Sequence, residues 1–319
     1  MPLSRDTVAW AYRILLDREP ESEDALLPKM RAYSTTRELR HDMVTSDEYQ
    51  EKNRDFAQSN ERNLVVKEIA PGLRLWVDLA DHAIGLNIIR GRYELNELDF
   101  IRRTVRPGQH VVDCGAHIGY FAMHLADAVG HTGSVAAFEP FGANAECLER
   151  SIRENRFEGR VRLERAAVGA AAGTLPLVYA PNTINSGGAF LQGESVVPEG
   201  HVTTSVPVAA LDALELRRPV AFIKADIEGA EPLAFRGADR LLREDRPVIL
   251  SELHPHQLER VSGLSAAAFI AEMRARGYRC HLLGAGVAGA EIDDAPSNGV
   301  TSVAFMPVFP AGHASPAGQ

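Results

Sequence analysis

The first 60 residues have the hydrophobic pattern of a small helical domain. In the stretch TVAWAYRILLD, apolar residues recur every three or four positions, which is the spacing of one face of a helix. Two further stretches, DALLPKMRAY and STTRELRHDMVTSDEYQEKN, have the same character. Ser34 or Thr35, and later Ser46, are placed to cap a helix N-terminus. We therefore expect a bundle of short helices over residues 1–60.

The period of the pattern changes at residue 64. Apolar and polar residues alternate on both sides of Pro71-Gly72, which predicts a β-hairpin. A helix is predicted in YELNELDFIRRTV, and buried strands then alternate with amphipathic helices as far as residue 309. The predicted strands lie in HVVDCG, SVAAFEP, VRLERAAVG, AFIKADIEG, PVILSELHP and TSVAFMPV.

Strands that alternate with helices specify an α/β fold with a doubly wound, mostly parallel, Rossmann-like sheet. We place this second domain at residues 61–309, with the hairpin entry at 64–90 and the core at 91–309. The tail at 310–319 is rich in Pro, Gly and Ala, so we expect it to be disordered.

A long polar loop spans roughly residues 179–202. Loops of this length in a compact domain often form a lid or one wall of a substrate site. Its side chains Asn182, Asn185 and Ser186 are suited to hydrogen bonding with the hydroxyl groups of an acceptor. A flexible surface loop is an equally good interpretation of the same composition.

Composition excludes several classes of protein. The formal net charge is −9, which argues against a dedicated nucleic-acid binder. No apolar run reaches the roughly 18 residues of a membrane helix, so we expect no membrane partner. Three widely spaced cysteines form neither a metal-binding spacing nor a disulfide framework. A cytoplasmic protein is therefore the expectation, and a homo-oligomer is left open.

The stretch VVDCGAHIGYF marks the first ligand-binding turn. Asp113 ends a predicted strand, and Gly115 and Gly119 follow in a G-x-x-x-G spacing that differs from the dinucleotide-binding G-x-G-x-x-G. An acid at this turn repels a pyrophosphate but attracts an amine or another cation. S-adenosylmethionine fits, because it carries a sulfonium, an amino group and a ribose. Glu139, at the end of the next strand, is placed to accept both ribose hydroxyls.

Three segments carry a resemblance to a known family. GRYELNELDFIRRTVRPGQHVVDCGAHIGYF, FEPFGANAECLERSIRENRF and FIKADIEGAE together resemble the FkbM family of S-adenosylmethionine-dependent methyltransferases, over about residues 64–283. The resemblance implies the class I methyltransferase fold and methyl transfer, commonly to a hydroxyl of a sugar or natural product. The segment AYRILLDREPESE is similar to short helical domains attached to glycan-modifying enzymes.

The resemblance also assigns cofactor-binding roles. Ala167 is expected nearest the adenine, and His117 stands where the family most often has Asn. The resemblance implies cofactor-binding roles for Glu94, Asp113, Gly115, Gly119, Glu139, Asn144 and Ala167, and we also expect His117 and Asp226 at the cofactor.

Titratable residues gather where the fourth and fifth strands end. Alternation places Lys224, Asp226 and Glu228 on one face, and the next strand presents Glu252 and His254 at the same rim. A neutral histidine beside an acid can take a proton from a hydroxyl near neutral pH. We therefore predict His254 as the general base, oriented by Glu228 or Glu252, with Asp226 near the methionine amine or the acceptor.

Two alternatives remain open for these residues. Asp226, Glu252 and His254, with Glu228, are a candidate Mg²⁺ site, although we favour the metal-free mechanism. The acids also suit structural ion pairs with Lys224.

The predicted function is O-methylation of a small-molecule or glycan acceptor. The alternatives are a non-catalytic binding module with this fold and an N-methyltransferase. The latter is disfavoured because DIEG stands where a planar amine would need an aromatic motif.

Overall fold

The computed structural model describes residues 3–16, 18–44, 46–52, 63–181, 187–193, 197–297 and 299–309. It divides into two compact units, one formed by Met1–Asn63 with Asp78–Ala80 and the other by Leu64–Val77 with Asp81–Gln319. The predicted disordered tail at 310–319 lies outside the described residues. No helix in the described ranges combines the length and hydropathy needed to cross a bilayer.

The described residues of the first unit form four short helices. These are α1 (Arg5–Leu16), α2 (Glu23–Ala32), α3 (Thr36–Val44) and α4 (Asp47–Lys52). Their apolar faces meet around Val8, Leu39 and Met43, which are at most 1% exposed. Thr35 caps α3, because its Oγ1 accepts the Glu38 N–H at 3.2 Å while the Glu38 carboxylate accepts the N–H of Thr35. The predicted helical bundle and this cap are confirmed.

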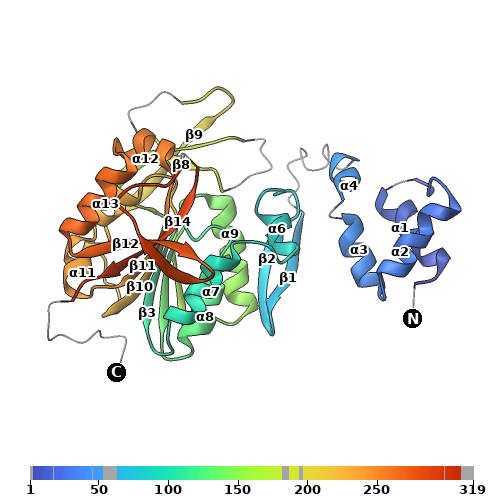
Figure 1. The fold of residues 1–319 in the computed structure, drawn as a ribbon, viewed down its shortest axis with the longest axis horizontal. Coiled ribbons are helices and arrows are strands. Elements are labelled where there is room, and N and C mark those ends of the chain that lie inside the picture. The colour runs from blue at the N-terminus through green and yellow to red at the C-terminus, as the bar shows by residue number, and fades with distance from the viewer. Residues whose placement is uncertain are drawn as a thin grey trace. The chain divides into compact units, whose positions relative to one another are not determined.

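The second unit is built on an eight-stranded sheet (Figure 1). Its spatial order is β13-β12-β14-β11-β10-β3-β4-β5. The five strands β11, β10, β3, β4 and β5 are parallel, and β14, β12 and β13 are antiparallel additions at one edge. The bounds are β3 (His110–Cys114), β4 (Ser134–Phe138), β5 (Val161–Glu164), β10 (Val220–Ala225), β11 (Val248–Leu253), β12 (Tyr278–Gly284), β13 (Val287–Glu291) and β14 (Thr301–Pro307). This is the Rossmann-like class I methyltransferase arrangement, so the predicted fold class is confirmed.

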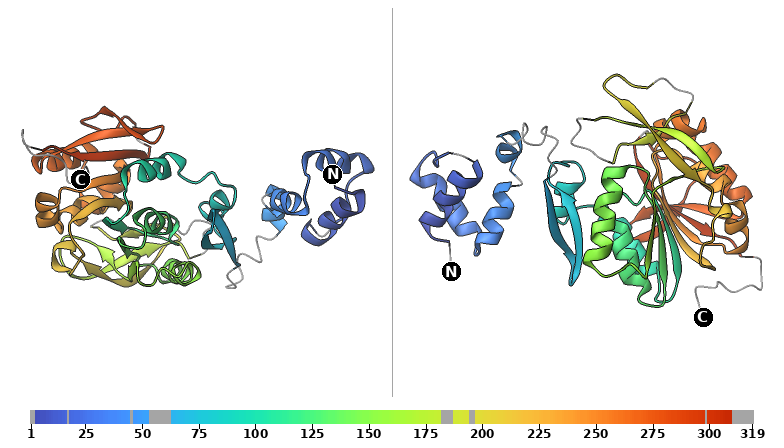
Figure 2. Two further views of the ribbon diagram at one scale, coloured as in Figure 1. Left: turned by 90° about the horizontal axis from the view of Figure 1, so that it is seen from below. Right: turned by 180° about the vertical axis from the view of Figure 1, so that it is seen from behind.

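Helices cover both faces of this sheet, as Figure 2 shows from two sides. On one face lie α7 (Leu95–Thr104), α8 (Tyr120–Val129) and α9 (Gly142–Glu154), whose buried side chains share one core cluster with the sheet. The other face carries α10 (Glu231–Arg236), α11 (Asp239–Glu244), α12 (Pro255–Ser262) and α13 (Ala266–Ala275). A sheet buried on both faces explains the nearly continuous apolar composition of its central strands.

The entry segment forms the predicted hairpin, β1 (Leu64–Ala70) and β2 (Leu73–Asp78). Alternate residues of β2, Leu73, Leu75 and Val77, are buried in the core cluster that contains α8 and α9. Helix α6 (Gly85–Ile89) follows within the segment predicted only as hairpin.

A second, four-stranded sheet was not predicted. It has the order β6-β9-β7-β8 and contains β6 (Ala167–Val168), β7 (Gly173–Tyr179), β8 (Phe190–Leu191) and β9 (Val202–Ala209). The predicted single strand VRLERAAVG is therefore two strands in different sheets, β5 and β6. The first four residues of β7 and the first four of β9 are exposed. Their sequences therefore lack the apolar alternation that a half-buried strand shows.

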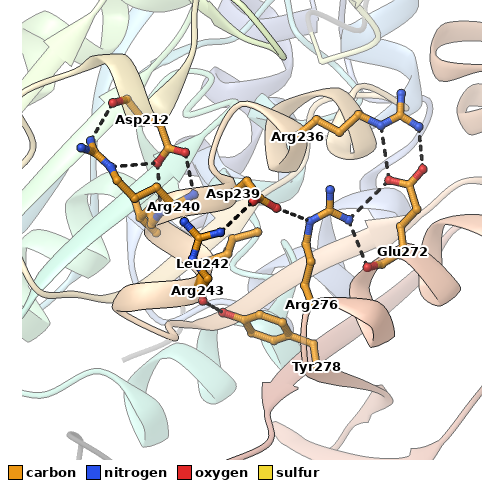
Figure 3. Close-up of polar contacts among 10 residues, drawn as sticks. Asp212, Arg236, Asp239, Arg240, Leu242, Arg243, Glu272, Arg276 and Tyr278 are labelled. Carbon is orange, nitrogen blue, oxygen red and sulfur yellow. Dashed lines mark hydrogen bonds and ion pairs between the residues drawn. The ribbon is translucent and has the colours of Figure 1, made fainter.

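The predicted helix PLAFRGADRLLRED is broken into α10 and α11 at Gly237. A Cβ atom there would lie 2.1 Å from the carbonyl oxygen of Gly169, so the backbones approach too closely for a side chain. Figure 3 shows the ion-pair network on both sides of this break. In it, Arg236 binds Glu272 at 2.6 Å and Arg276 binds Asp239 at 3.2 Å. These pairs link α10, α11 and α13 at the surface.

Packing should outweigh these ion pairs in holding α13 to the sheet. Phe269 is fully buried and its ring lies 5.9 Å from Phe235 and 5.3 Å from Phe305. We expect Phe269→Ala to lower the free energy of unfolding by about 3–5 kcal/mol. The partly exposed Glu272 makes two ion pairs, and Glu272→Gln should lower the free energy of unfolding by less than about 1 kcal/mol.

Urea denaturation followed by tryptophan fluorescence measures both values. The chain has two tryptophans, and Trp10 is in the helical unit, so a Trp10→Phe background leaves Trp76 to report on the second unit. If Phe269→Ala and Glu272→Gln lowered the free energy of unfolding equally, the expectation that apolar burial contributes more than the ion pairs would be contradicted.

Candidate active site

A cavity of about 270 Å³ lies at the carboxyl edge of the parallel strands. Parallel strands leave their following loops at one edge, and ligands of doubly wound sheets bind there. Its walls come from the turns after β3, β4 and β10, from Glu252 near the end of β11, from the region around α7 and α8, and from the second sheet. The predicted site residues that line it are Glu94, Gly115, His117, Glu139, Asn144, Ala167, Lys224, Asp226, Glu228 and Glu252.

The turn after β3 is held against the turn after β10. Gly115 has φ +78°, and a Cβ there would lie 2.0 Å from the carbonyl oxygen of Asp226. Only glycine permits both this conformation and this contact. Gly119 does not line the cavity. It begins α8 with φ +96°, where a Cβ would lie 2.5 Å from Leu148 of α9, so its function is to let the two helices pack closely.

Glu139 is fixed at the end of β4 by two backbone donors. The N–H of His117 donates to Oε2 and the N–H of Phe141 donates to Oε1, both at 2.8 Å. Burial raises the pKa of this carboxyl to about 7, although the two hydrogen bonds oppose the shift. Each oxygen keeps a lone pair that can accept a hydroxyl group of a bound molecule.

Asp113 lies beneath the cavity and does not line it. Its side chain is fully buried, and neither carboxylate oxygen has a hydrogen-bond partner among the described residues. Burial raises the pKa of Asp113 to about 6, while Lys224, its register partner on the adjacent strand, opposes the shift. A buried acceptor left unsatisfied is costly and marks a place where a donor can bind.

Lys224 supplies the positive charge of the site. Its Nζ lies 3.1 Å from Oδ2 of Asp226 and 4.8 Å from the ring centre of Phe121. Burial lowers the pKa of Lys224, but Asp226, Asp113 and Glu94 together raise it well above its usual range. The lysine therefore stays charged and holds Asp226 in place.

Glu94, Asp226 and Glu252 bring three carboxyl groups together in the same region. One carboxylate oxygen from each lies within 4.8 Å of the others. Burial and the neighbouring carboxyls raise the pKa of Glu252 well above its usual range, and burial does the same for Glu94. The structure thus replaces His254 with Glu94 in the predicted candidate metal set. Carboxylate oxygens suit Mg²⁺, but Lys224 already pairs with Asp226 in this group.

Besides Gly115, three non-glycine residues of the described cavity wall have left-handed backbone conformations. These are Glu94 at φ +41°, His117 at φ +53° and Glu228 at φ +53°. Non-glycine residues seldom adopt this region, although Asn and His do so more readily than most. This explains how His117 can occupy a position at which the resembling family most often has Asn. Burial lowers the pKa of His117 to about 4, so its ring is neutral.

The structure places His254, the predicted general base, outside the cavity lining. His254 is absent from the cavity walls, because β11 ends at Leu253 and His254 begins α12. Strand alternation therefore stops before it could place His254 beside Glu252. The pKa of His254 is lowered by burial and by His256, and no carboxyl of the cavity contributes to that shift.

The structure adds residues that the sequence did not single out. Phe190 and Leu191 of β8 line the cavity, and Arg260 lies 4.2 Å above the ring of Phe190. Gln257 of α12 donates from Nε2 to Oε2 of Glu228 at 3.2 Å. The predicted substrate residues Asn182, Asn185 and Ser186 lie outside the described residues.

Fold and site together define a class I methyltransferase domain. The sequence model of the Methyltransferase FkbM domain family matches residues 113–280, more than half of the chain. The chain belongs to this family, as the sequence resemblance predicted.

Individual relatives are more distant. Methyltransferase sdnD of Sordaria araneosa is 27% identical over 164 residues, which cover 40% of this chain and 60% of that protein. The structure of methyltransferase FkbM from Methylobacillus flagellatus is 18% identical with a TM-score of 0.41, covering 71% of this chain and 53% of that one. An O-methyltransferase from Bacillus cereus, solved in complex with SAH, is 17% identical with a TM-score of 0.38, covering 66% and 80%. The chain thus spans only about half to three fifths of the length of the first two relatives.

The buried acid should reduce stability at neutral and basic pH. The folded-state pKa of Asp113 is raised, so wild-type protein binds more protons than the unfolded chain and loses stability as pH rises from about 4 to above 6. Asp113→Asn removes this charge, and we expect a higher melting temperature than wild type at pH 8. The difference should shrink at pH 5, and melting curves at both pH values measure it.

Asp127→Asn, an exposed change on α8, is the matched control. A lower melting temperature for Asp113→Asn at pH 8 would mean that Lys224 more than offsets the burial of the carboxylate.

Proposed function

We propose that this chain is an S-adenosylmethionine-dependent O-methyltransferase that acts on a hydroxyl of a sugar, glycan or secondary metabolite. The observation that carries the proposal is the pair of acids at the ends of β3 and β4. Glu139 is aimed by two backbone donors, and the buried carboxylate of Asp113 has no hydrogen-bond partner among the residues that the structure describes. Family membership supports the same activity.

The residues present fit the cofactor. Glu139 offers two acceptor oxygens to the ribose hydroxyls, and Ala167 and Asn144 line the adjoining wall, where the resemblance places the rest of the nucleoside. Oε2 of Glu94, which lines the cavity and has no hydrogen-bond partner among the described residues, attracts the amino group of the methionine part, and the charge of the buried Asp113 favours a cation there. No phosphate-binding glycine loop is needed, because this cofactor has no phosphate.

When bound, S-adenosylmethionine supplies a methyl group that its sulfonium has already activated. The protein then has to hold the acceptor in line, exclude water and receive one proton. Glu228 and Glu252 lie at the carboxyl edge of β10 and β11, where they can accept hydrogen bonds from acceptor hydroxyls. Phe190 and Leu191 give the cavity an apolar wall that limits access of water.

A Mg²⁺-assisted variant of this mechanism has one observation in its favour, the proximity of Glu94, Asp226 and Glu252. We rank it second because Lys224 already supplies a positive charge to Asp226. Titrations with and without Mg²⁺ separate the two mechanisms.

Calorimetric titration of S-adenosylmethionine and of S-adenosylhomocysteine tests the proposal. We expect micromolar binding by the wild type and about 10- to 150-fold weaker binding by Glu139→Gln, because a buried charged hydrogen bond contributes roughly 1.5–3 kcal/mol. Arg162→Gln, a change of an exposed residue on β5, is the control. Absence of binding at millimolar ligand would refute the cofactor and favour a non-catalytic binding module.

A further inference from the structure

The loop that carries Glu228 is fixed from two directions. Asp226 lies against the turn at Gly115, and Gly229 lies against α12, where a Cβ would be 2.2 Å from the carbonyl oxygen of Gln257. Between these contacts Glu228 takes a left-handed conformation and lines the cavity. A strained residue held by its surroundings at a ligand cavity suggests a function for its side chain.

We propose that Glu228 is the general base that takes the proton of the acceptor hydroxyl, and that Gln257 is the positioning residue that aims it. This inference rests on the proposed function. Gln257 is 9% exposed, and its Nε2 donates to Oε2 of Glu228 at 3.2 Å. This hydrogen bond holds Oε2 in place. Oε1 can then accept a hydrogen bond, and later the proton, from the hydroxyl of the substrate.

The other titratable groups of the cavity are less suited to this role. Asp226 is already paired with Lys224. Burial and Asp226 raise the pKa of Glu252 well above its usual range, which disfavours the carboxylate form that a base requires. Glu94 belongs to the same group of three carboxyls and is expected to bind the cofactor. His254 does not line the cavity.

The electrostatic environment of Glu228 favours proton uptake near neutral pH. Burial raises its pKa to about 7, with a further contribution from Asp226, while Gln257 and Lys224 lower it. Glu231 and Glu252 also face this region, since each has its own pKa raised in part by Glu228. A base works best when its pKa lies near the working pH.

The step balances without any further reactant. The acceptor oxygen forms a bond to the methyl carbon as the bond between that carbon and sulfur breaks, and the sulfonium becomes a neutral thioether. The proton of the hydroxyl passes to Oε1 of Glu228, which becomes neutral. Glu228 then releases the proton to water.

A direct titration of Glu228 tests the assignment without an acceptor. The full chain is labelled with glutamate carrying ¹³C at Cδ, saturated with S-adenosylhomocysteine, and followed by NMR from pH 4 to pH 9. Comparison with Glu228→Gln assigns the Glu228 signal. We expect a midpoint near 7 and, in Gln257→Met, a higher midpoint because a donor to the carboxylate is lost. A midpoint in the ordinary range, about 4.3, would overturn the proposal.

Kinetics provide the second readout. With labelled S-adenosylmethionine and a neutral methyl glycoside that the wild type methylates, Glu228→Gln should lower kcat about 10²- to 10⁴-fold and leave S-adenosylhomocysteine affinity unchanged. Gln257→Met should shift the acid limb of the kcat/KM profile to higher pH, which a purely structural role would not do. Glu259→Gln, an exposed change on α12, is the matched control.

Two outcomes separate this inference from the proposed function. If His254→Asn loses turnover while Glu228→Gln keeps it, the base is His254 and the inference is wrong, although the enzyme assignment stands. If the wild type does not bind S-adenosylmethionine, the proposed function fails first.

Discussion

Lys224 places one positive charge beside a group of carboxyl groups that the fold removes from water. It is the only lysine or arginine among the described residues that line the cavity, whereas Glu94, Glu139, Asp226, Glu228 and Glu252 all line it. The register of the parallel strands fixes this arrangement, because Lys224 on β10 lies beside Asp113 on β3. One cation cannot neutralise so many acids, so burial raises the pKa of several of them.

This imbalance has a direct consequence for ligand binding. Buried carboxyls without enough partners destabilise the folded domain, and a bound group with positive charge and several donors relieves that condition. A cofactor with a sulfonium, an amino group and ribose hydroxyls has this chemistry. The same electrostatics that reduce the stability of the domain therefore favour a ligand of this kind.

The sequence predicted the parts of this site that follow from strand periodicity. Asp113 and Glu139 end consecutive parallel strands, so their offset along the chain places them at one edge of the sheet. Glu94 is different, because it was assigned by resemblance alone. It lies just before α7, and its own left-handed backbone conformation lets it line the cavity. His254 was predicted by extending the alternation one residue past the end of β11 at Leu253, and the structure places it outside the cavity lining. No sequence pattern predicted Gln257, because only a tertiary contact brings α12 to Glu228.

The two glycine contacts explain why the site can be precise despite its strain. Gly115 admits the carbonyl of Asp226 from one side, and Gly229 admits the backbone of Gln257 from the other. Larger residues at either position would push the loop after β10 away from a neighbour and release the carboxylates it carries. Because the loop is held between two rigid elements, Asp226 and Glu228 need little reorganisation when a ligand binds, which is the condition under which electrostatic groups contribute most to catalysis. The glycines therefore act on the chemistry indirectly, by fixing where the carboxyl groups stand.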